Sequence, residues 1–264
     1  GKGGFPAAGI AGAAIASSVS EAVSLLFFII YTSMTADKRK YGFRRAFTLR
    51  PHLLKGMLSI SGWTMVQSFI SVSIWFIFFL AIEHLGERPL AVTNIVRNIS
   101  ALLIMVISAF ATTAGALISN QIGAGEQRCL FKTCGMTLKL TYAILIPLLI
   151  ILCLFPESVL RAFTDSPSLI AASVNSVYVM ASSTLIMAPS FILFNAVSGT
   201  GNTRAGFIME MISLAVYTAV IYYGIIRLKP DVALCWFSEH VYGVTLIFLA
   251  WWYLKSGKWR GKKV

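Results

Sequence analysis

The sequence predicts an all-α membrane protein, a polytopic bundle of transmembrane helices, and two observations lead to this fold class. Apolar residues make up 57% of the 264-residue chain and charged residues only 12%, about half the charged fraction of an average soluble domain. Seven stretches are each long and apolar enough to cross the hydrocarbon core of a bilayer, which takes about 20 helical residues. Membrane lipid is therefore the expected surrounding of most of this chain.

The predicted spans are separated by residues that end helices. In chain order they cover residues 10–33, 53–84, 98–117, 138–155, 171–197, 205–226 and 232–253. The first carries closely spaced small residues, among them Gly12 and Ala16, which allow another helix backbone to approach. The later boundaries coincide with glycine or proline, in the order Gly86, Gly123 to Gly125, Pro156, Pro167, Gly199 to Gly201 and Pro230.

Basic residues predict the orientation of these spans. Residues 36–55 carry seven Lys or Arg against one Asp, and short loops rich in Lys and Arg stay in the cytoplasm. With this loop inside, most other basic residues, including those of the carboxy-terminal tail, also fall inside. We expect a multi-pass protein of the bacterial cytoplasmic (inner) membrane with a cytoplasmic carboxy-terminus. The net charge of +12 then indicates attraction to anionic lipid and no nucleic-acid partner.

The basic segment divides the spans unequally, with one before it and six after it. Many transporters consist of two repeats with the same number of helices. We therefore expect residues 1–35 to hold the last transmembrane helix of an amino-terminal lobe, residues 36–55 to form a cytoplasmic loop between lobes, and residues 56–264 to form a carboxy-terminal lobe of six helices. The rest of the amino-terminal lobe would be a missing partner of this sequence.

Two acidic residues within the spans are candidates for ion coupling, since a carboxylate in hydrocarbon is costly unless it faces the bundle interior or a wet cavity. Glu21 lies near the middle of the first span, with Ser17 one turn earlier on the same face. This pair either binds or relays a cation or makes structural hydrogen bonds to another helix. Glu210 lies in the sixth span and either couples to an ion or pairs with Arg204 near the inner interface.

Uncharged polar and flexible residues predict a solute cavity. Gln67 and Ser71 lie one turn apart in the second span, and the fifth span, which contains Pro189, adds a further group. Side chains of this kind accommodate varied apolar shapes or bond across helices. The cavity candidates are Gln67, Ser71, Tyr178, Met180, Met187 and Asn195. Arg97 is expected at the outer end of the third span, where its side chain can reach the interface.

Motifs of enzymes are missing from the sequence. It contains no Ser-His-Asp set, no paired catalytic carboxylates, no HExxH and no Walker motif, so we expect no enzyme activity, no catalytic residue and no cofactor. The pairs Gly123/Gly125 and Gly199/Gly201 follow apolar helices and lack the third glycine of a dinucleotide fingerprint. They are expected to end helices at cytoplasmic turns. The four cysteines form no metal-ligand spacing.

An ordered set of motifs resembles the MATE (multidrug and toxic compound extrusion) family of transporters. The motifs are GFPAAGIAGAAIASSVSE at 4–21, ALISNQIGAGEQR at 116–128, RAFTDSPSLI at 161–170, NAVSGTGNTR at 195–204 and SGKWR at 256–260. Their order is similar to helices six to twelve of a twelve-helix fold with two lobes around a central cavity. The resemblance implies a secondary antiporter that exports small amphipathic or cationic solutes in exchange for Na⁺ or H⁺.

The family's coupling residues match this sequence only in part. Ser17 occupies the hydroxyl position of the family motif in the first span. Where many members carry Pro and, eight residues later, Glu on helix seven, this sequence has Trp63 and Ser71, and the region of a helix-ten acid holds Met187. Two alternatives stay open. One is a flippase for lipid-linked precursors, for which Arg97 is the single basic cavity candidate, and the other is a scaffold fragment without transport activity.

Overall fold

The computed structural model describes residues 9–35, 51–257 and 259, and within them seven helices are long and apolar enough to cross a membrane. The all-α fold is confirmed, since these residues include no strand. The helices are α1 (Gly9–Thr35), α2 (Pro51–Glu83), α3 (Glu87–Gly123), α4 (Leu130–Leu154), α6 (Pro167–Gly199), α7 (Thr203–Val220) and α9 (Ser238–Ser256). Shorter elements connect them, namely η2 (Gln127–Cys129), α5 (Pro156–Leu160), the π-helical η3 (Ile221–Arg227) and α8 (Val232–Cys235).

The chain divides into two compact units, Gly1–Gly56 and Met57–Val264. Most of the predicted inter-lobe loop, residues 36–50, lies outside the described residues, as do residues 258 and 260–264 of the basic tail. One boundary differs from the prediction, because α2 begins at Pro51 and residues 51–55 are helical. Proline is favoured in the first turn of a helix, where its missing N–H costs no hydrogen bond.

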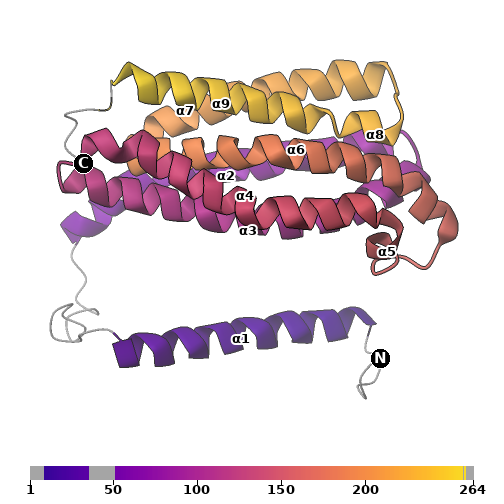
Figure 1. Cartoon of the computed structure of the whole chain (residues 1–264), viewed down its shortest axis with the longest axis horizontal. Helices are drawn as coiled ribbons and strands as arrows, with labels where there is room; N and C mark the ends of the chain where they lie inside the picture. The colour runs from indigo at the N-terminus through magenta and orange to yellow at the C-terminus, as the bar shows by residue number, and fades with distance from the viewer. Residues whose placement is uncertain (1–8, 36–50, 258, 260–264) are drawn as a thin grey trace. The chain divides into compact units, whose positions relative to one another are not determined.

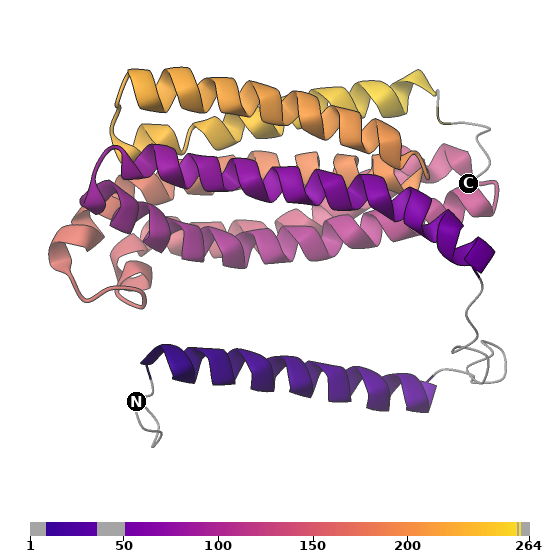
Figure 2. The same cartoon turned by 180° about the vertical axis from the view of Figure 1, so that it is seen from behind.

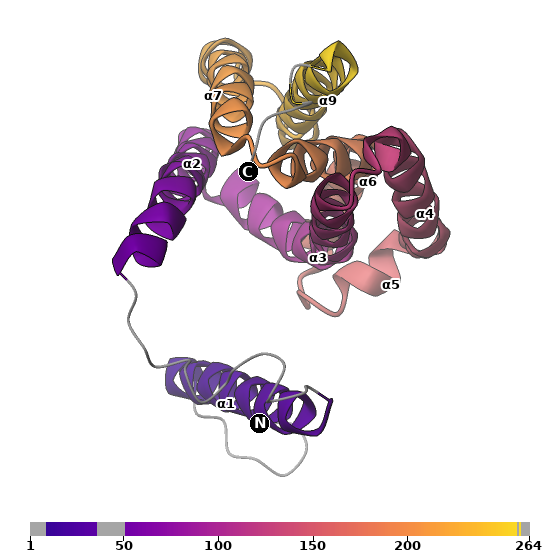
Figure 3. The same ribbon diagram turned by 90° about the vertical axis from the view of Figure 1, so that its left-hand side faces the viewer.

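In the second unit, α6 is the central helix. It contacts α3, α4, α7 and α9, and the end-on view shows α3, α4 and α9 around it (Figure 3). The long helices of this unit run roughly along a common direction, as the two side views show (Figures 1 and 2). Half of the α6 membrane segment is buried, the largest share among the described spans. The fifth span is therefore the element on which the others of this unit pack.

Large apolar side chains cover outward faces of α2 and α4. Phe69, Ile150 and Leu154 are all exposed, although each would be costly to leave in water. Lipid chains solvate such groups, while the backbone polar groups are satisfied inside each helix. These faces agree with an integral membrane protein that crosses the bilayer several times.

The glycine and proline signals mark helix boundaries as predicted. Gly125 and Gly201 have φ values of 84° and 78°, a left-handed backbone that glycine adopts without strain. Asn202 then caps the start of α7, with its side-chain oxygen accepting a hydrogen bond from the Ala205 N–H at 3.2 Å. Pro156 and Pro167 stand in the first turns of α5 and α6. Both glycine pairs therefore act as turns between helices.

The third span is longer than predicted. We expected it to begin at Asn98, but α3 begins at Glu87 and continues through Arg97. The polar residues of this region lower its apolar content without breaking the helix, since neither Glu nor Arg opposes helix formation. Arg97 therefore lies in the third turn of α3 and not at its end, which corrects its predicted placement.

Two glycines let α3 and α6 approach closely. A Cβ added at Gly199 would lie 2.5 Å from the Gly115 carbonyl oxygen and 3.2 Å from the Gly115 Cα. A Cβ added at Gly115 would lie 2.9 Å from the Asn195 carbonyl oxygen. Since these neighbours are backbone atoms, neither contact can be relieved by a side-chain rotation. Small residues at helix crossings are the usual means of close packing in membranes.

We predict that Gly199→Ala lowers the free energy of unfolding by about 1–3 kcal/mol, because the helices must separate to admit the methyl group. Gly135→Ala in α4 is the matched control, since a Cβ there meets nothing within 4 Å and alanine favours helix. Denaturation in mixed micelles measures both. Equal stability of the two variants would contradict the close approach.

Candidate functional site

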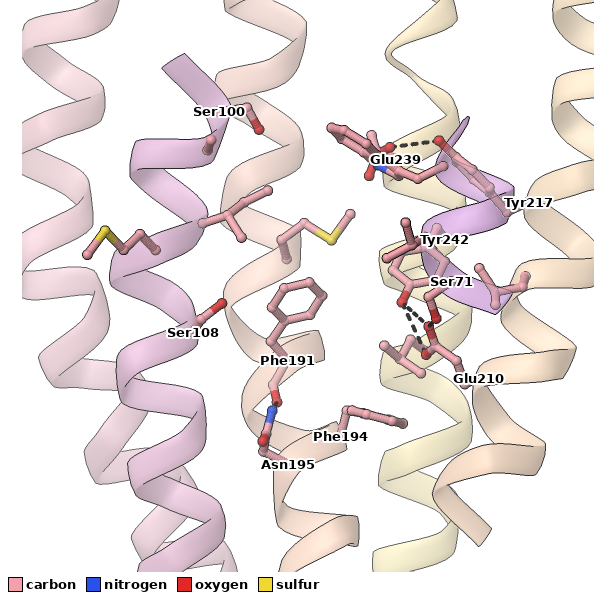
Figure 4. Close-up of a pocket in the computed structure, with 18 of the residues that line it drawn as sticks. Ser71, Ser100, Ser108, Phe191, Phe194, Asn195, Glu210, Tyr217, Glu239 and Tyr242 are labelled. Atoms are coloured by element: carbon pink, nitrogen blue, oxygen red, sulfur yellow. Dashed lines mark hydrogen bonds between the residues drawn. The ribbon is translucent and has the colours of Figure 1, made fainter. Parts of the chain in front are cut away.

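A cavity of about 660 Å³ opens within the second unit, and α2, α3, α6, α7 and α9 contribute to its walls. Figure 4 shows Ser100 and Ser108 of α3 on one side and two acid–tyrosine pairs on the other, with Phe191, Phe194 and Asn195 of α6 between them. Apolar side chains supply most of the remaining surface. The cavity thus combines an apolar body with a few polar groups, as small-molecule sites usually do.

Glu210 of α7 is a buried carboxylate that accepts hydrogen bonds from two other helices. The Ser71 hydroxyl of α2 donates to its Oε1 at 2.8 Å. The Tyr242 hydroxyl of α9 lies 2.9 Å from Oε1 and 3.1 Å from Oε2 (Figure 4). The side chain is only 4% exposed, and among the described residues no basic side chain pairs with it. Glu210 is therefore held by uncharged donors alone.

Arg204 is not the partner of Glu210. It is exposed in the first turn of α7, whereas Glu210 points to α2 and α9. The structural alternative that the sequence left open, an ion pair between these two residues, is therefore wrong for the described structure. The six-residue separation explains it, because two residues six apart lie on different faces of an α-helix.

A second buried carboxylate, Glu239, lines the same cavity. The Tyr217 hydroxyl of α7 donates to its Oε1 at 2.8 Å, and the Trp75 side chain of α2 also interacts with it. The rings of Tyr217 and Tyr242 meet edge to face with centroids 5.8 Å apart. The two acid–tyrosine pairs are therefore adjacent, and each pair links α7 with α9.

The sequence contains a signal for this arrangement that a search for single acids within spans misses. Glu239 and Tyr242 are three residues apart in α9, and Glu210 and Tyr217 are seven apart in α7, so each pair shares one helix face. Each helix donates its tyrosine to the acid of the other. A carboxylate and a tyrosine on the same face of two adjacent spans therefore indicate such a site. Glu239 lies inside the predicted span 232–253 but was not among the acids chosen there.

Three of the six predicted cavity residues line the cavity, namely Ser71, Met187 and Asn195. Gln67 is not in the wall, but its backbone carbonyl lies 3.0 Å from the Ser71 Oγ. Met180 is 1% exposed and packs in the core cluster with Val177 and Trp236. Its placement in the cavity is corrected, because the Met180 side chain packs among core side chains and not in the cavity wall.

Tyr178 faces a different neighbour. Its hydroxyl lies 3.4 Å from the Cys153 carbonyl oxygen of α4, and the residue is 44% exposed. Two residues of helix separate it from Met180, which turns it by about 200° around the axis. The residues of α6 predicted together therefore divide between two faces, and Tyr178 is also removed from the cavity.

Ser17 and Glu21 lie on α1, in the first unit, and both side chains are exposed within the described residues. Their role in ion coupling stays a prediction. Within the part of the chain that is described, no group of three or more His, Cys, Asp or Glu side chains could hold a metal ion. Carboxylate and hydroxyl oxygens from three helices meet around Glu210 in the second unit.

Comparisons with known proteins point to membrane transporters. Residues 64–223 match the MatE family. The Uncharacterized transporter YisQ of Bacillus subtilis is 24% identical over 80% of this chain and 46% of its own length. The Probable multidrug resistance protein NorM of Thermotoga maritima is 25% identical over 100% of this chain and 57% of its own length. The chain thus spans about half the length of these curated relatives.

Solved structures show the same fold. A MOP superfamily transporter from Pyrococcus furiosus superposes with a TM-score of 0.67 at 14% identity, covering 75% of this chain and 44% of the other. An outward-facing multidrug resistance MATE family transporter of the MOP superfamily gives a TM-score of 0.68 at 14% identity, covering 77% and 46%. At this identity the likeness concerns the fold alone.

We predict that Tyr242→Phe lowers the free energy of unfolding by about 1–3 kcal/mol, because it removes a donor from a buried carboxylate while keeping the ring. In combination with Glu210→Gln the loss should be smaller than the sum of the two single effects. Tyr223→Phe, at a side chain 67% exposed, is the control and should behave as wild type. Additive effects of Tyr242→Phe and Glu210→Gln in mixed-micelle denaturation would show that the two groups are uncoupled.

Proposed function

The chain belongs to the MatE family, and on this premise we propose that it forms the carboxy-terminal lobe of a secondary active antiporter. The antiporter exports amphipathic, often cationic solutes in exchange for Na⁺ or H⁺. The observation that carries the proposal is Glu210, a carboxylate buried in a cavity wall with hydroxyl donors and no basic partner among the described residues. The names of the relatives, a transporter and a probable multidrug resistance protein, agree with it.

A buried charge without a counter-charge gives Glu210 its coupling role. Removing a carboxylate from water is costly, and hydrogen bonds from Ser71 and Tyr242 offset only part of this cost. A proton or Na⁺ supplies the missing positive charge. Oxygen ligands suit a hard cation such as Na⁺, and three side chains bring oxygens together here. A cationic solute in the same cavity competes for the same charge.

Ser71 links ion binding to helix position. Its hydroxyl lies 2.8 Å from Glu210 Oε1 and 3.0 Å from the Gln67 carbonyl oxygen, so one proton has two acceptors. When a proton neutralises Glu210, the Ser71 hydroxyl can bond within α2 alone. The helix α2 can then separate from α7 without an unsatisfied polar group. Ion occupancy thereby changes the relative stability of two helix arrangements, which is the requirement for coupling.

The cavity wall suits solutes of varied shape. Met105 and Met187 are unbranched and polarisable, and Phe191 and Phe194 offer flat apolar surfaces. Pro189 lies within α6 between these groups and removes one backbone donor from the helix. Methionine and phenylalanine side chains bind a solute through the apolar area that they bury, and they require no fixed pattern of hydrogen bonds. They therefore favour amphipathic solutes as a class.

Glu210→Gln is expected to reduce solute efflux driven by a Na⁺ or H⁺ gradient by about tenfold or more, because glutamine keeps the shape but carries no charge to exchange. Efflux is measured with protein reconstituted in liposomes. Glu157→Gln, at an exposed residue of α5, is the control and should leave efflux unchanged. Gradient-driven efflux at the wild-type rate in Glu210→Gln would refute the coupling role, and Glu21→Gln tests the α1 candidate in the same assay.

A further inference from the structure

Arg97 of α3 brings a positive charge into the cavity wall. It lines the cavity from α3, and its buried Nε has no hydrogen-bond partner among the described residues. No acidic side chain in the described ranges forms an ion pair with it. An arginine is always charged and is costly to keep from water without a partner. The described structure therefore leaves one of its strongest hydrogen-bonding groups unused.

A ring contact holds the guanidinium in place. Its central carbon lies 5.3 Å from the centroid of the Phe79 ring of α2, within the range of a cation–π interaction. A cation–π contact uses no hydrogen-bond acceptor, so the N–H groups of the guanidinium are not consumed by it. The contact orients Arg97 without neutralising it.

A second donor of the same helix lies next to Arg97. Ser100 follows three residues later, on the same face of α3, and is 5% exposed in the cavity wall. Its hydroxyl makes no hydrogen bond with any described residue. Arginine and serine together present a forked cation and a hydroxyl, which fit the oxygens of a carboxylate or a phosphate.

The acids of the cavity do not take this role. Glu210 and Glu239 lie on α7 and α9 and accept from Ser71, Tyr242 and Tyr217. In Figure 4 they lie on the side away from Ser100. The cavity wall therefore carries charged groups of both signs, a cation from α3 and two acids from α7 and α9.

We propose that Arg97 and Ser100 form an anion subsite for an acidic group, a carboxylate or a phosphate, carried on an apolar body. The inference rests on the proposed function, since it concerns the solute of the same cavity. It adds that solutes with an acidic group bind better than neutral solutes of the same shape. The bidentate geometry of arginine makes the subsite selective for oxyanions over other polar groups.

The matched probes 1-pyrenebutyrate and 1-pyrenebutanol test the subsite, because they share one apolar body and differ in the acidic group. Binding to the purified protein in lipid nanodiscs is measured by fluorescence, with empty nanodiscs subtracted. Wild type should bind the carboxylate about tenfold more tightly than the alcohol. Arg97→Gln should abolish this preference while changing binding of the alcohol less than about twofold, and Arg97→Lys should restore part of it.

Arg161→Gln, at an exposed residue, is the control and should keep the preference of wild type. A thermal melt verifies that each variant is folded. Equal binding of both probes by wild type, or an equal loss of both in Arg97→Gln, would overturn the anion subsite and leave the proposed antiporter standing. Binding of neither probe by wild type would contradict the solute cavity itself, and with it the proposed function.

Competition identifies the source of the acidic group. Dodecyl phosphate carries a lipid-like phosphate, and dodecanol is its neutral match. Displacement of 1-pyrenebutyrate by dodecyl phosphate and not by dodecanol supports the subsite with a lipid phosphate as its ligand. Displacement by neither, with tight binding of 1-pyrenebutyrate retained, supports the subsite with a soluble carboxylate. Equal displacement by both would show that the apolar body alone decides binding and would overturn the proposal.

Discussion

The hydrogen bonds around Glu210 join three helices through one buried carboxylate. Ser71 donates from α2 and Tyr242 from α9, while the acid itself belongs to α7. Because the side chain is almost fully buried, each lost donor leaves a charge less well satisfied in a medium of low dielectric. The mutual position of these helices and the charge state of Glu210 are therefore linked. An interaction of this kind stabilises one arrangement of helices only while the charge is present.

The packing of the other helices in the second unit determines which contacts near Glu210 can change. The close crossing of α3 and α6 at Gly115 and Gly199 joins two of the cavity's helices through backbone contact. The adjoining wall, from α7 and α9, meets α2 through side chains such as Ser71 and Trp75. A wall held by backbone packing resists separation, whereas one held by hydrogen bonds to a titratable group can open when that group is neutralised. The cavity thus has one wall, α3 and α6, that is held together by close backbone packing, and another, α2 with α7 and α9, that is joined through side-chain contacts to Glu210 and Glu239.

The local features of this fold could be predicted from the sequence. Length and apolar content are properties of each segment, so the seven spans were predicted correctly, as were the helix boundaries near Gly125, Gly201 and Pro156. The start of α3 was not, because a polar segment can continue a helix beyond the hydrocarbon without any local signal. Apolar content therefore predicts a span better than it predicts a helix boundary.

The partners of the polar residues could be predicted only in part. Glu210 and Ser71 were selected because polar side chains in apolar spans are costly without a hydrogen-bond partner or a cavity. In the structure the Ser71 hydroxyl donates to the Glu210 carboxylate. Which face of α6 borders the cavity depends on how neighbouring helices pack, so Met187 and Asn195 line the described cavity, whereas Met180 is buried in the core and Tyr178 lies against α4. Which side chains pair across helices depends on how the helices pack, so it cannot be predicted from the sequence of a single span.

Glu210 is expected to exchange a proton or a cation when the solute binds. Infrared difference spectroscopy of the purified protein, recorded on solute addition and on replacement of Na⁺ at constant pH, observes carboxyl groups directly. We expect a change in the carboxyl bands of wild type that disappears in Glu210→Gln. A difference spectrum that is the same in the variant and in wild type would contradict this exchange.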